Sequence, residues 1–438
     1  MVRRRSSSWI AVLTACAVVL AACGGDDDDT VTPDDTADVT EPASTEPSSE
    51  EPASEPTEPS DASAPETSDA SGDESAEAPP ADFQLDEPVR IIMNFGLPGS
   101  DAVAVPEHRD ASALAVEQIN AAGGIGGLPV EYEIIHTPID PQEALTAINL
   151  AYEQNPTILM GGVSSSQVLA AARTIQDGGI PYIHFSAADN LAFGEEGGSE
   201  WSFRQRLSNE VLTRAAAEFM VSELGLQRIG IAYLDAEYGV SGAEALTAHI
   251  EDLGGEVAVS RPHTFDATDL TADVLEFADV DGVIAWTFPN QIALLLNQMK
   301  DNGISLPFMT TESGAVTLSQ GLIDPETAAE MYAVSQCNPP ASDRAAQLVS
   351  DYEAAYGITP DGNAAGVYDT IFMIKHVIED IQTTDPEAIR DALREVSYDG
   401  QCTNFRGHPD THDLSTDTVI LDWADDGSVS VVTEILGS

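Results

Sequence analysis

Short apolar runs alternate with longer segments of helical periodicity along most of the chain, from residue 89 onwards. Apolar runs bounded by turn residues predict strands, and apolar positions three and four apart predict helices. The predicted strands cover residues 89–95, 130–136, 201–206, 228–234, 257–262, 282–287, 307–311, 331–335, 418–423 and 428–435. The predicted helices cover residues 106–120, 141–154, 210–224, 240–253, 270–278, 289–302, 341–356, 364–381 and 386–396.

Strands separated by helices of this length predict an α/β fold with parallel sheets flanked by helices. The pattern of the first half restarts after residue 207, which predicts two similar lobes. We assign residues 89–206 plus about 337–415 to lobe 1, and residues 207–336 plus about 416–438 to lobe 2. Because the chain then passes between the lobes several times, we expect a hinge.

One βαβ unit, residues 158–191, has a polar turn after each of its strands. In open parallel sheets, ligands bind at the edge where the strands end. The first turn, residues 164–166, is three serines that open a helix, where free N–H groups attract an anion such as a carboxylate. The second turn ends in Asp189, whose carboxylate suits a cationic amine. Together the turns could hold a small zwitterion, although serine at a helix start is also the usual N-cap.

The first 88 residues have the pattern of an export signal followed by a tether. A basic start precedes an apolar run, residues 10–22, that is too short to span a bilayer. Residues 20–23, LAAC, resemble the bacterial lipobox, in which the cysteine is lipidated. We expect a signal peptide over residues 1–22, lipidation at Cys23 and a disordered acidic tether over residues 23–88, since this segment cannot bury enough apolar surface to fold. The alternatives are an ordinary cleavage site and an acidic interaction tail.

The composition is strongly acidic. The chain has 75 Asp and Glu against 17 Lys and Arg, a formal net charge of −58. Phosphate binding needs clustered Lys and Arg, so we expect no nucleic-acid partner. The acidity favours solubility and suits life in salt.

Two cysteines, Cys337 and Cys402, lie in the segment expected to fold. In an exported domain they predict one disulfide that closes a long loop, and two free buried thiols are the alternative. His408 and His412 are four residues apart, but Pro409 argues against a helix that would align them. We therefore expect no metal site.

Residues 115–127, AVEQINAAGGIGG, resemble the A-x-x-x-I-N-A-x-G-G-I-x-G signature of type I periplasmic solute-binding proteins. More closely, the chain is similar to the leucine/isoleucine/valine-binding family of ABC importers. Further matches in chain order are DPQEA at 140–144, GGVSSS at 161–166, IPYI at 180–183, SAADN at 186–190, and the pairs at 203–204, 238–239 and 311–312. The likeness covers roughly residues 89–435.

The resemblance implies the type I periplasmic-binding-protein fold, in which two Rossmann-like lobes close on a small solute. By motif, Ser165 would bind the ligand carboxylate, Ala187 would offer backbone groups and Glu312 would accept the amine. Tyr238 would close from the second lobe, and Phe288 would wall the side-chain pocket or pack in the core. The implied ligand-binding residues are Ser164, Ser165, Ser166, Ala187, Ala188, Asp189, Tyr238, Phe288 and Glu312.

Asp189 departs from the family, which usually has Thr or Ser at this position. A second carboxylate near the amine site favours a cationic or polyamine-like head, or one carboxylate is neutral or paired with arginine. The candidates for that pairing are Arg109, Arg204 and Arg206. We therefore expect a ligand other than leucine.

The resemblance predicts a receptor, and the LAAC sequence predicts that a lipid anchors it to the outer face of the cell membrane. It would capture an amino acid, amide or amine by hinge closure and deliver it to an ABC permease. We expect a monomer that needs no cofactor and is not an enzyme. A sensory binding protein without a permease is the alternative. A serine hydrolase is a remote one, because Ser165 and His184 lack a G-x-S-x-G elbow and a strand histidine usually packs in the core.

Overall fold

The computed structural model describes residues 83–96, 106–189, 198–415 and 417–435. The expected signal peptide, Cys23 and most of the expected tether lie outside the described residues. The last part of the expected tether, residues 83–88, is described and contacts the folded domain. Leu85 donates its N–H to the Gly126 carbonyl at 3.0 Å, and Phe83 and Leu85 pack against the core. None of the helices within the described ranges is long and apolar enough to cross a membrane.

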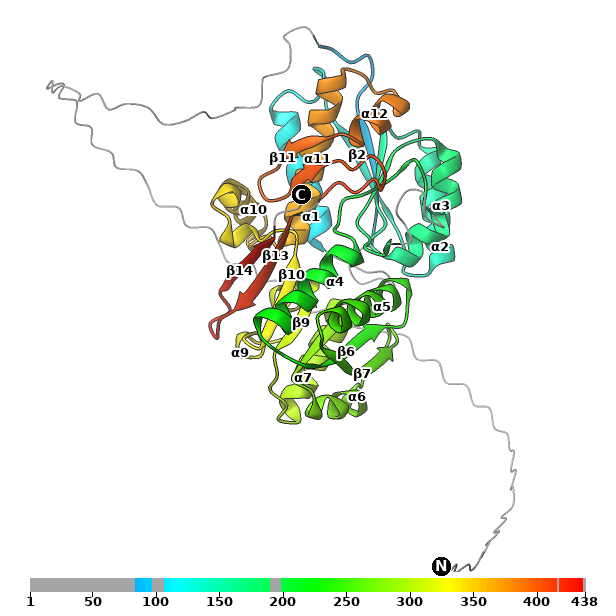
Figure 1. Ribbon diagram of the computed structural model, residues 1–438. Coiled ribbons are helices and arrows are strands. Elements are labelled where there is room, and N and C mark those ends of the chain that lie inside the picture. Colours follow the sequence, from blue (N-terminus) through cyan, green and yellow to red (C-terminus); the bar gives the residue numbers. More distant parts are fainter. Residues whose placement is uncertain (1–82, 97–105, 190–197, 416, 436–438) are drawn as a thin grey trace, which may run out of the picture. The chain divides into compact units, whose positions relative to one another are not determined.

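Five parallel strands form the first sheet, in the order β2-β1-β3-β4-β5. They are β1 (Arg90–Phe95), β2 (Glu131–His136), β3 (Ile158–Gly161), β4 (Tyr182–His184) and β5 (Ser202–Arg204). The helices packed around them are α1 (Pro106–Ala121), α2 (Pro141–Glu153), α3 (Ser165–Gly178), α10 (Ala346–Tyr356), α11 (Gly362–Ile381) and α12 (Pro386–Leu393). We call this sheet with its helices the first lobe. Figure 1 shows α2 and α3 side by side.

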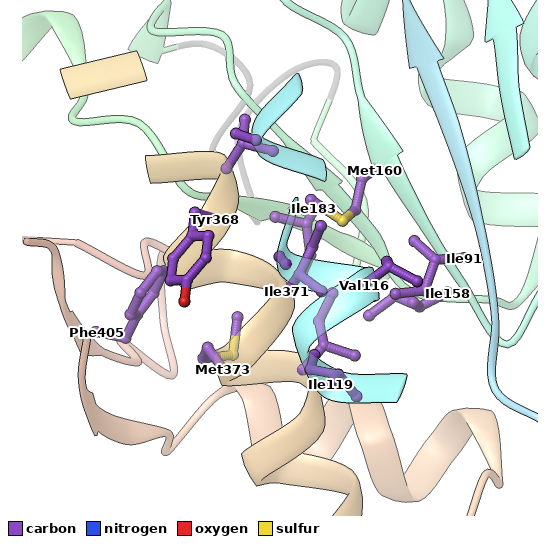
Figure 2. Close-up of a cluster of buried hydrophobic side chains, with 14 of the residues drawn as sticks. Ile91, Val116, Ile119, Ile158, Met160, Ile183, Tyr368, Ile371, Met373 and Phe405 are labelled. Atoms are coloured by element: carbon purple, nitrogen blue, oxygen red, sulfur yellow. The ribbon is translucent and has the colours of Figure 1, made fainter. Parts of the chain in front are cut away.

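Helices α1 and α11 are far apart in the sequence but pack against each other in the first lobe. Figure 2 shows Val116 and Ile119 of α1 in one cluster with Ile371 of α11 and with Ile91 and Ile158 of the sheet. All five side chains are buried, and burial of one such side chain stabilises the fold by roughly 1.5–3 kcal/mol. The C-terminal third of the chain therefore completes the core that the N-terminal strands begin.

Seven strands form the second sheet, in the order β14-β13-β10-β9-β8-β6-β7. They are β6 (Arg228–Leu234), β7 (Glu256–His263), β8 (Gly282–Trp286), β9 (Phe308–Thr311), β10 (Met331–Ser335), β13 (Thr418–Trp423) and β14 (Val429–Ile435). Strands β6–β10 are parallel, and the hairpin of β13 and β14 adds antiparallel to β10. These strands and the helices packed around them form the second lobe. The helices are α4 (Asn209–Ala217), a following π-helical turn, α5 (Glu237–Asp252), α6 (Thr271–Glu276), α7 (Pro289–Asp301), α8 (Ser313–Ser319) and α9 (Pro325–Ala328).

These two sheets confirm the predicted α/β class with parallel sheets flanked by helices. The short helices α8 and α9 and the small hairpin of β11 (Ser397–Asp399) and β12 (Asn404–Arg406) were not predicted, because they are too short to show a periodicity. Helix α5 begins three residues earlier than predicted, at Glu237. Its N-cap residue is Ala236, whose side chain gives no capping signal.

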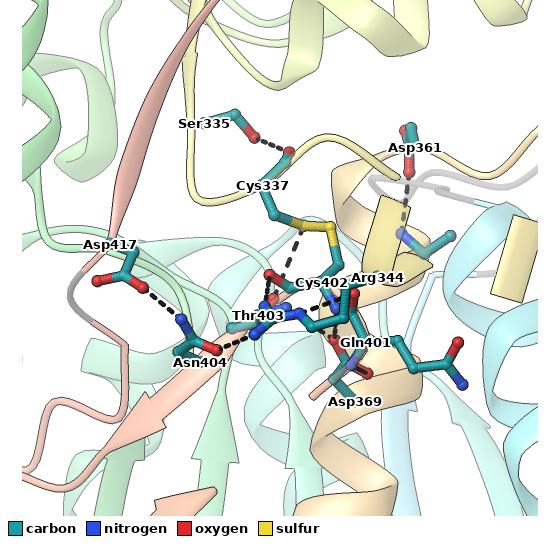
Figure 3. Close-up of a disulfide and its surroundings, with 11 residues drawn as sticks. Ser335, Cys337, Arg344, Asp361, Asp369, Gln401, Cys402, Thr403, Asn404 and Asp417 are labelled. Carbon is teal, nitrogen blue, oxygen red and sulfur yellow. Dashed lines mark hydrogen bonds between the residues drawn. A yellow bond between two sulfur atoms is a disulfide. The ribbon is translucent and has the colours of Figure 1, made fainter. Parts of the chain in front are cut away.

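The chain returns from the second lobe to the first after β10, and a disulfide fastens this crossing. Cys337 is bonded to Cys402 in the loop between β11 and β12 (Figure 3). The same loop donates the N–H groups of residues 401–403 to the carboxylate of Asp369, each at 2.8 Å. The crossing is therefore tied covalently to a loop that α11 already holds.

Candidate functional site

A small cavity of about 40 Å³ lies where the carboxyl ends of both sheets meet the chain crossings. This is the edge at which ligands bind in open parallel sheets. The first lobe lines it with His108, Val163 and Phe185, and the second lobe with Phe288, Glu312 and Val316. Gln205 and Arg206, in the crossing after β5, and Gln336, in the crossing after β10, also line it. A solute in this position would contact both lobes and these two crossings.

An ion pair between the lobes forms one side of the cavity. Arg206 follows β5 of the first lobe and Glu312 follows β9 of the second, and Nε of Arg206 lies 2.7 Å from Oε1 of Glu312. The two side chains are only 12% and 10% exposed. Burial alone would lower the pKa of Arg206, but the charge of Glu312 and the hydroxyl of Tyr238 outweigh it, and the pKa is raised. Arg206 therefore remains a cation held against a carboxylate.

Aromatic rings support this ion pair from the second lobe. The guanidinium of Arg206 lies 5.2 Å from the ring centroid of Tyr238, within the range of a cation–π contact. Tyr238 stacks on Phe288 with centroids 5.7 Å apart. Phe288 is the N-cap residue of α7, so the cavity wall is set where that helix begins.

A neutral histidine faces the ion pair from the first lobe. His108 of α1 packs between Phe95 and Phe185, with ring centroids 5.0 and 5.8 Å away. Burial, and then the charge of Arg206, lower the pKa of His108 to about 3. The imidazole is therefore uncharged at neutral pH and contributes no second cation.

Two glutamines bring unused hydrogen-bonding groups to the cavity. Gln205 is 1% exposed, and neither its Nε2 nor Oε1 of Gln336 has a hydrogen-bond partner among the described residues. Both amides lie against Gly366 of α11, where a Cβ would come within 2.9 Å of Gln205 Nε2 and 2.7 Å of Gln336 Nε2. Glycine at this position is what lets the two amides reach the cavity wall.

The predicted serine turn lies beside the cavity and holds a neighbouring loop. Gln167 accepts the Ser164 N–H at the start of α3, at 3.1 Å. Oγ of Ser165 accepts the N–H of Ala188 at 3.2 Å, and Ser166 is half-buried on α3. Arg204 donates to the Ala188 carbonyl at 2.9 Å and pairs with Asp413. Only Val163, just before the serines, lines the cavity.

The second predicted turn connects the first lobe to α4. Oδ1 of Asp189 accepts the N–H of Glu210 at 3.1 Å, and the Ala187 carbonyl accepts the N–H of Asn209 at 2.6 Å. Burial raises the pKa of Asp189, against the opposing effects of the Glu210 N–H and of Arg204. The carboxylate therefore caps the start of α4 and does not line the cavity.

The structure thus brings two of the nine predicted residues, Phe288 and Glu312, into the cavity wall, with Tyr238 directly behind them. Gln205, Gln336 and His108 were not predicted as site residues, and Arg206 was named only as a pairing candidate. Gln205 and Arg206 are the last two residues of a predicted strand, 201–206, and Gln336 follows another, so their positions at strand ends were an available signal. In the structure β5 ends earlier, at Arg204, so all three residues follow strands. For His108 there was no such signal, because its burial depends on Phe95 and Phe185 from other elements.

The model of the periplasmic binding protein family matches residues 88–428. The Leu/Ile/Val-binding protein homolog 8 of Brucella abortus is 26% identical over 333 residues, 72% of this chain and 82% of the relative. The leucine-, isoleucine-, valine-, threonine- and alanine-binding protein of Pseudomonas aeruginosa is 25% identical over 346 residues, 78% of this chain and 91% of the relative.

Solved structures show the same fold at lower identity. The branched-chain amino acid transporter substrate binding protein LivJ of Streptococcus pneumoniae, in complex with isoleucine, superposes with a TM-score of 0.68 at 21% identity, over 79% of this chain and 99% of that one. An ABC transporter substrate-binding protein of Sphaerobacter thermophilus gives a TM-score of 0.71 at 22% identity, over 80% and 98% of the two chains.

Proposed function

Because the chain belongs to the family of periplasmic binding proteins, we propose that it is an extracytoplasmic receptor for a small amino acid, amide or amine. The observation that carries the proposal is the cavity at the strand ends, lined by both lobes and by the crossings after β5 and β10. A buried, largely apolar cavity with a few convergent polar groups is the usual form of a small-molecule site.

Hinge closure is the proposed mechanism of capture. A solute that contacts Phe288 in the second lobe and Phe185 in the first makes its full set of contacts only when the lobes are closed. A ligand shifts such an equilibrium by its differential affinity for the two forms, so binding favours the closed receptor. Gln205 and Gln336 lie in crossings between the lobes, where the backbone bends during closure. Their contacts with the solute would therefore form as the lobes close.

The proposal has two further parts: the receptor delivers its solute to an ABC importer, and a lipid anchors the receptor to the membrane. The relatives named as transporter substrate-binding proteins support the importer as partner. The LAAC sequence supports lipidation of Cys23, which lies outside the described residues. In cell fractionation, Cys23→Ala is expected to move the receptor from the membrane fraction to the soluble fraction. A variant that stays with the membrane would count against the anchor.

Isothermal titration calorimetry of the full chain tests the binding function. The panel contains amino acids, amides, urea and polyamines, and at least one is expected to bind. Glu312→Ala removes a carboxylate that lines the cavity and is expected to weaken that binding by about 1.5–3 kcal/mol. The matched control is Glu256→Ala, at an exposed glutamate of β7, which should leave Kd unchanged. A panel without any binder, or a Glu312→Ala variant with unchanged Kd, would overturn the proposal.

A further inference from the structure

We propose that the solute is an uncharged primary amide, recognised by Gln205 and Gln336. This inference rests on the proposed function and narrows its ligand to one chemical class. Two independent features carry it: the internal ion pair and the two unpartnered amide atoms.

The ion pair disfavours charged solutes. Glu312 already holds a cation, Arg206, at 2.7 Å. An ammonium solute at Glu312 would compete with Arg206 for the carboxylate, and a carboxylate solute at Arg206 would compete with Glu312 for the guanidinium. Either exchange leaves one buried charge without its partner, which is strongly unfavourable. An uncharged solute leaves the pair intact.

The two glutamines require a ligand that is both acceptor and donor. Nε2 of Gln205 is a donor and Oε1 of Gln336 is an acceptor, and both are unpartnered among the described residues. A buried polar atom without a partner is destabilising, so a solute that satisfies both atoms gains their full hydrogen bonds. A primary amide carries a carbonyl for the first and an NH₂ group for the second. A protonated amine offers no acceptor, and a carboxylate offers no donor.

Phe288 and Val316 give the cavity an apolar wall, which suits a small apolar group on the amide.

A set of isosteric probes separates charge from shape. Acetamide is neutral, acetate is an anion and acetamidinium is a cation of the same size. In calorimetry with the full chain, we expect acetamide to bind and each ion to bind at least tenfold more weakly. Equal or tighter binding of either ion, or of leucine, would overturn the inference. Tight leucine binding would leave the proposed function standing, whereas no binding by any small solute would count against both.

Reciprocal charge variants test the role of the ion pair. Arg206→Gln frees Glu312, so binding of acetamidinium is expected to strengthen at least tenfold. Glu312→Gln frees Arg206, and acetate is expected to gain by a similar factor. Circular dichroism shows whether each variant is folded. Because one variant can fold when the other does not, a single folded variant is enough for the test. A folded variant without the expected gain would contradict the inference.

The amide contact has its own variant and control. Gln205→Met keeps the side-chain length and removes the donor, and is expected to weaken acetamide binding at least tenfold. Gln347→Met makes the same change at an exposed position on α10 and should have no effect. Unchanged acetamide affinity in the folded Gln205→Met variant would show that Gln205 does not recognise the solute.

Discussion

Nε of Arg206 and Oε1 of Glu312 lie 2.7 Å apart, although the first residue follows a strand of one sheet and the second follows a strand of the other. The pair is nearly buried and is backed by the ring of Tyr238. It links the two lobes at the cavity and satisfies the one carboxylate that the family resemblance assigned to a ligand amine. The internal cation therefore changes which solutes the receptor can accept.

Breaking this pair should destabilise the protein. Arg206→Met leaves the Glu312 carboxylate buried without a partner, and such losses cost about 3–5 kcal/mol. We expect that decrease in the free energy of unfolding, measured by urea denaturation. The matched control is Arg214→Met, which breaks an exposed pair with Glu210 and should cost no more than about 1 kcal/mol. Equal effects of the two variants would show that the buried pair adds no stability.

Glu107 should make stability fall as the pH rises. Burial, and then the neighbouring Asp361, raise the pKa of Glu107 to about 7 from 4.5. The folded protein thus binds more protons than the unfolded chain between these pH values, so the free energy of unfolding decreases as pH rises through the window. We expect Glu107→Gln to be more stable than the wild type at pH 8, by an amount of the order of 1–3 kcal/mol.

Urea denaturation of both proteins at pH 4 and pH 8 measures this effect. The difference between variant and wild type should be small at pH 4, where the carboxyl is protonated in the folded protein and largely protonated in the unfolded chain, and larger at pH 8. A difference that does not grow with pH would show that Glu107 titrates normally in the folded protein.

The disulfide should stabilise the crossing after β10. Cys337 and Cys402 are separated by 65 residues, and loss of a native disulfide typically costs about 2–5 kcal/mol. The double variant Cys337→Ala/Cys402→Ala is expected to lose stability in that range, and reduction of the wild type should reproduce the loss. Peptide mapping without reductant that recovers the two cysteines on unlinked peptides would refute the bond.

Asp189 should affect stability rather than solute preference. Its carboxylate accepts the Glu210 N–H and does not line the cavity. Asp189→Ala is expected to cost about 1 kcal/mol, the usual net value of one hydrogen bond. The ranking of solutes in calorimetry should be the same as for the wild type, whereas Glu312→Gln changes it. A changed ranking in Asp189→Ala would return this residue to the ligand site.

The fold was predictable because it depends on local signals. Alternating apolar runs, helical periodicity and Gly or Pro at the boundaries give the order of strands and helices, and parallel strands follow from that order. The edge of the sheets that carries the cavity was also predictable, since Glu312 and Phe288 follow predicted strands.

The direction of individual side chains was not predictable. Ser165 accepts a hydrogen bond from the N–H of Ala188, and Asp189 accepts one from the N–H of Glu210. In each pair the two residues are more than 20 positions apart along the chain. Arg206 was one of three candidate arginines, and nothing in the sequence chooses it over Arg204 as the partner of Glu312. That choice depends on how the two lobes meet, which local patterns do not encode.

Mass spectrometry of the solute released when the purified full chain is denatured tests the central claim most directly. The account predicts one small, uncharged, amide-bearing solute, released from the wild type and greatly reduced in Gln205→Met. Release of leucine, isoleucine or valine instead, or of no small solute from any preparation, would contradict it.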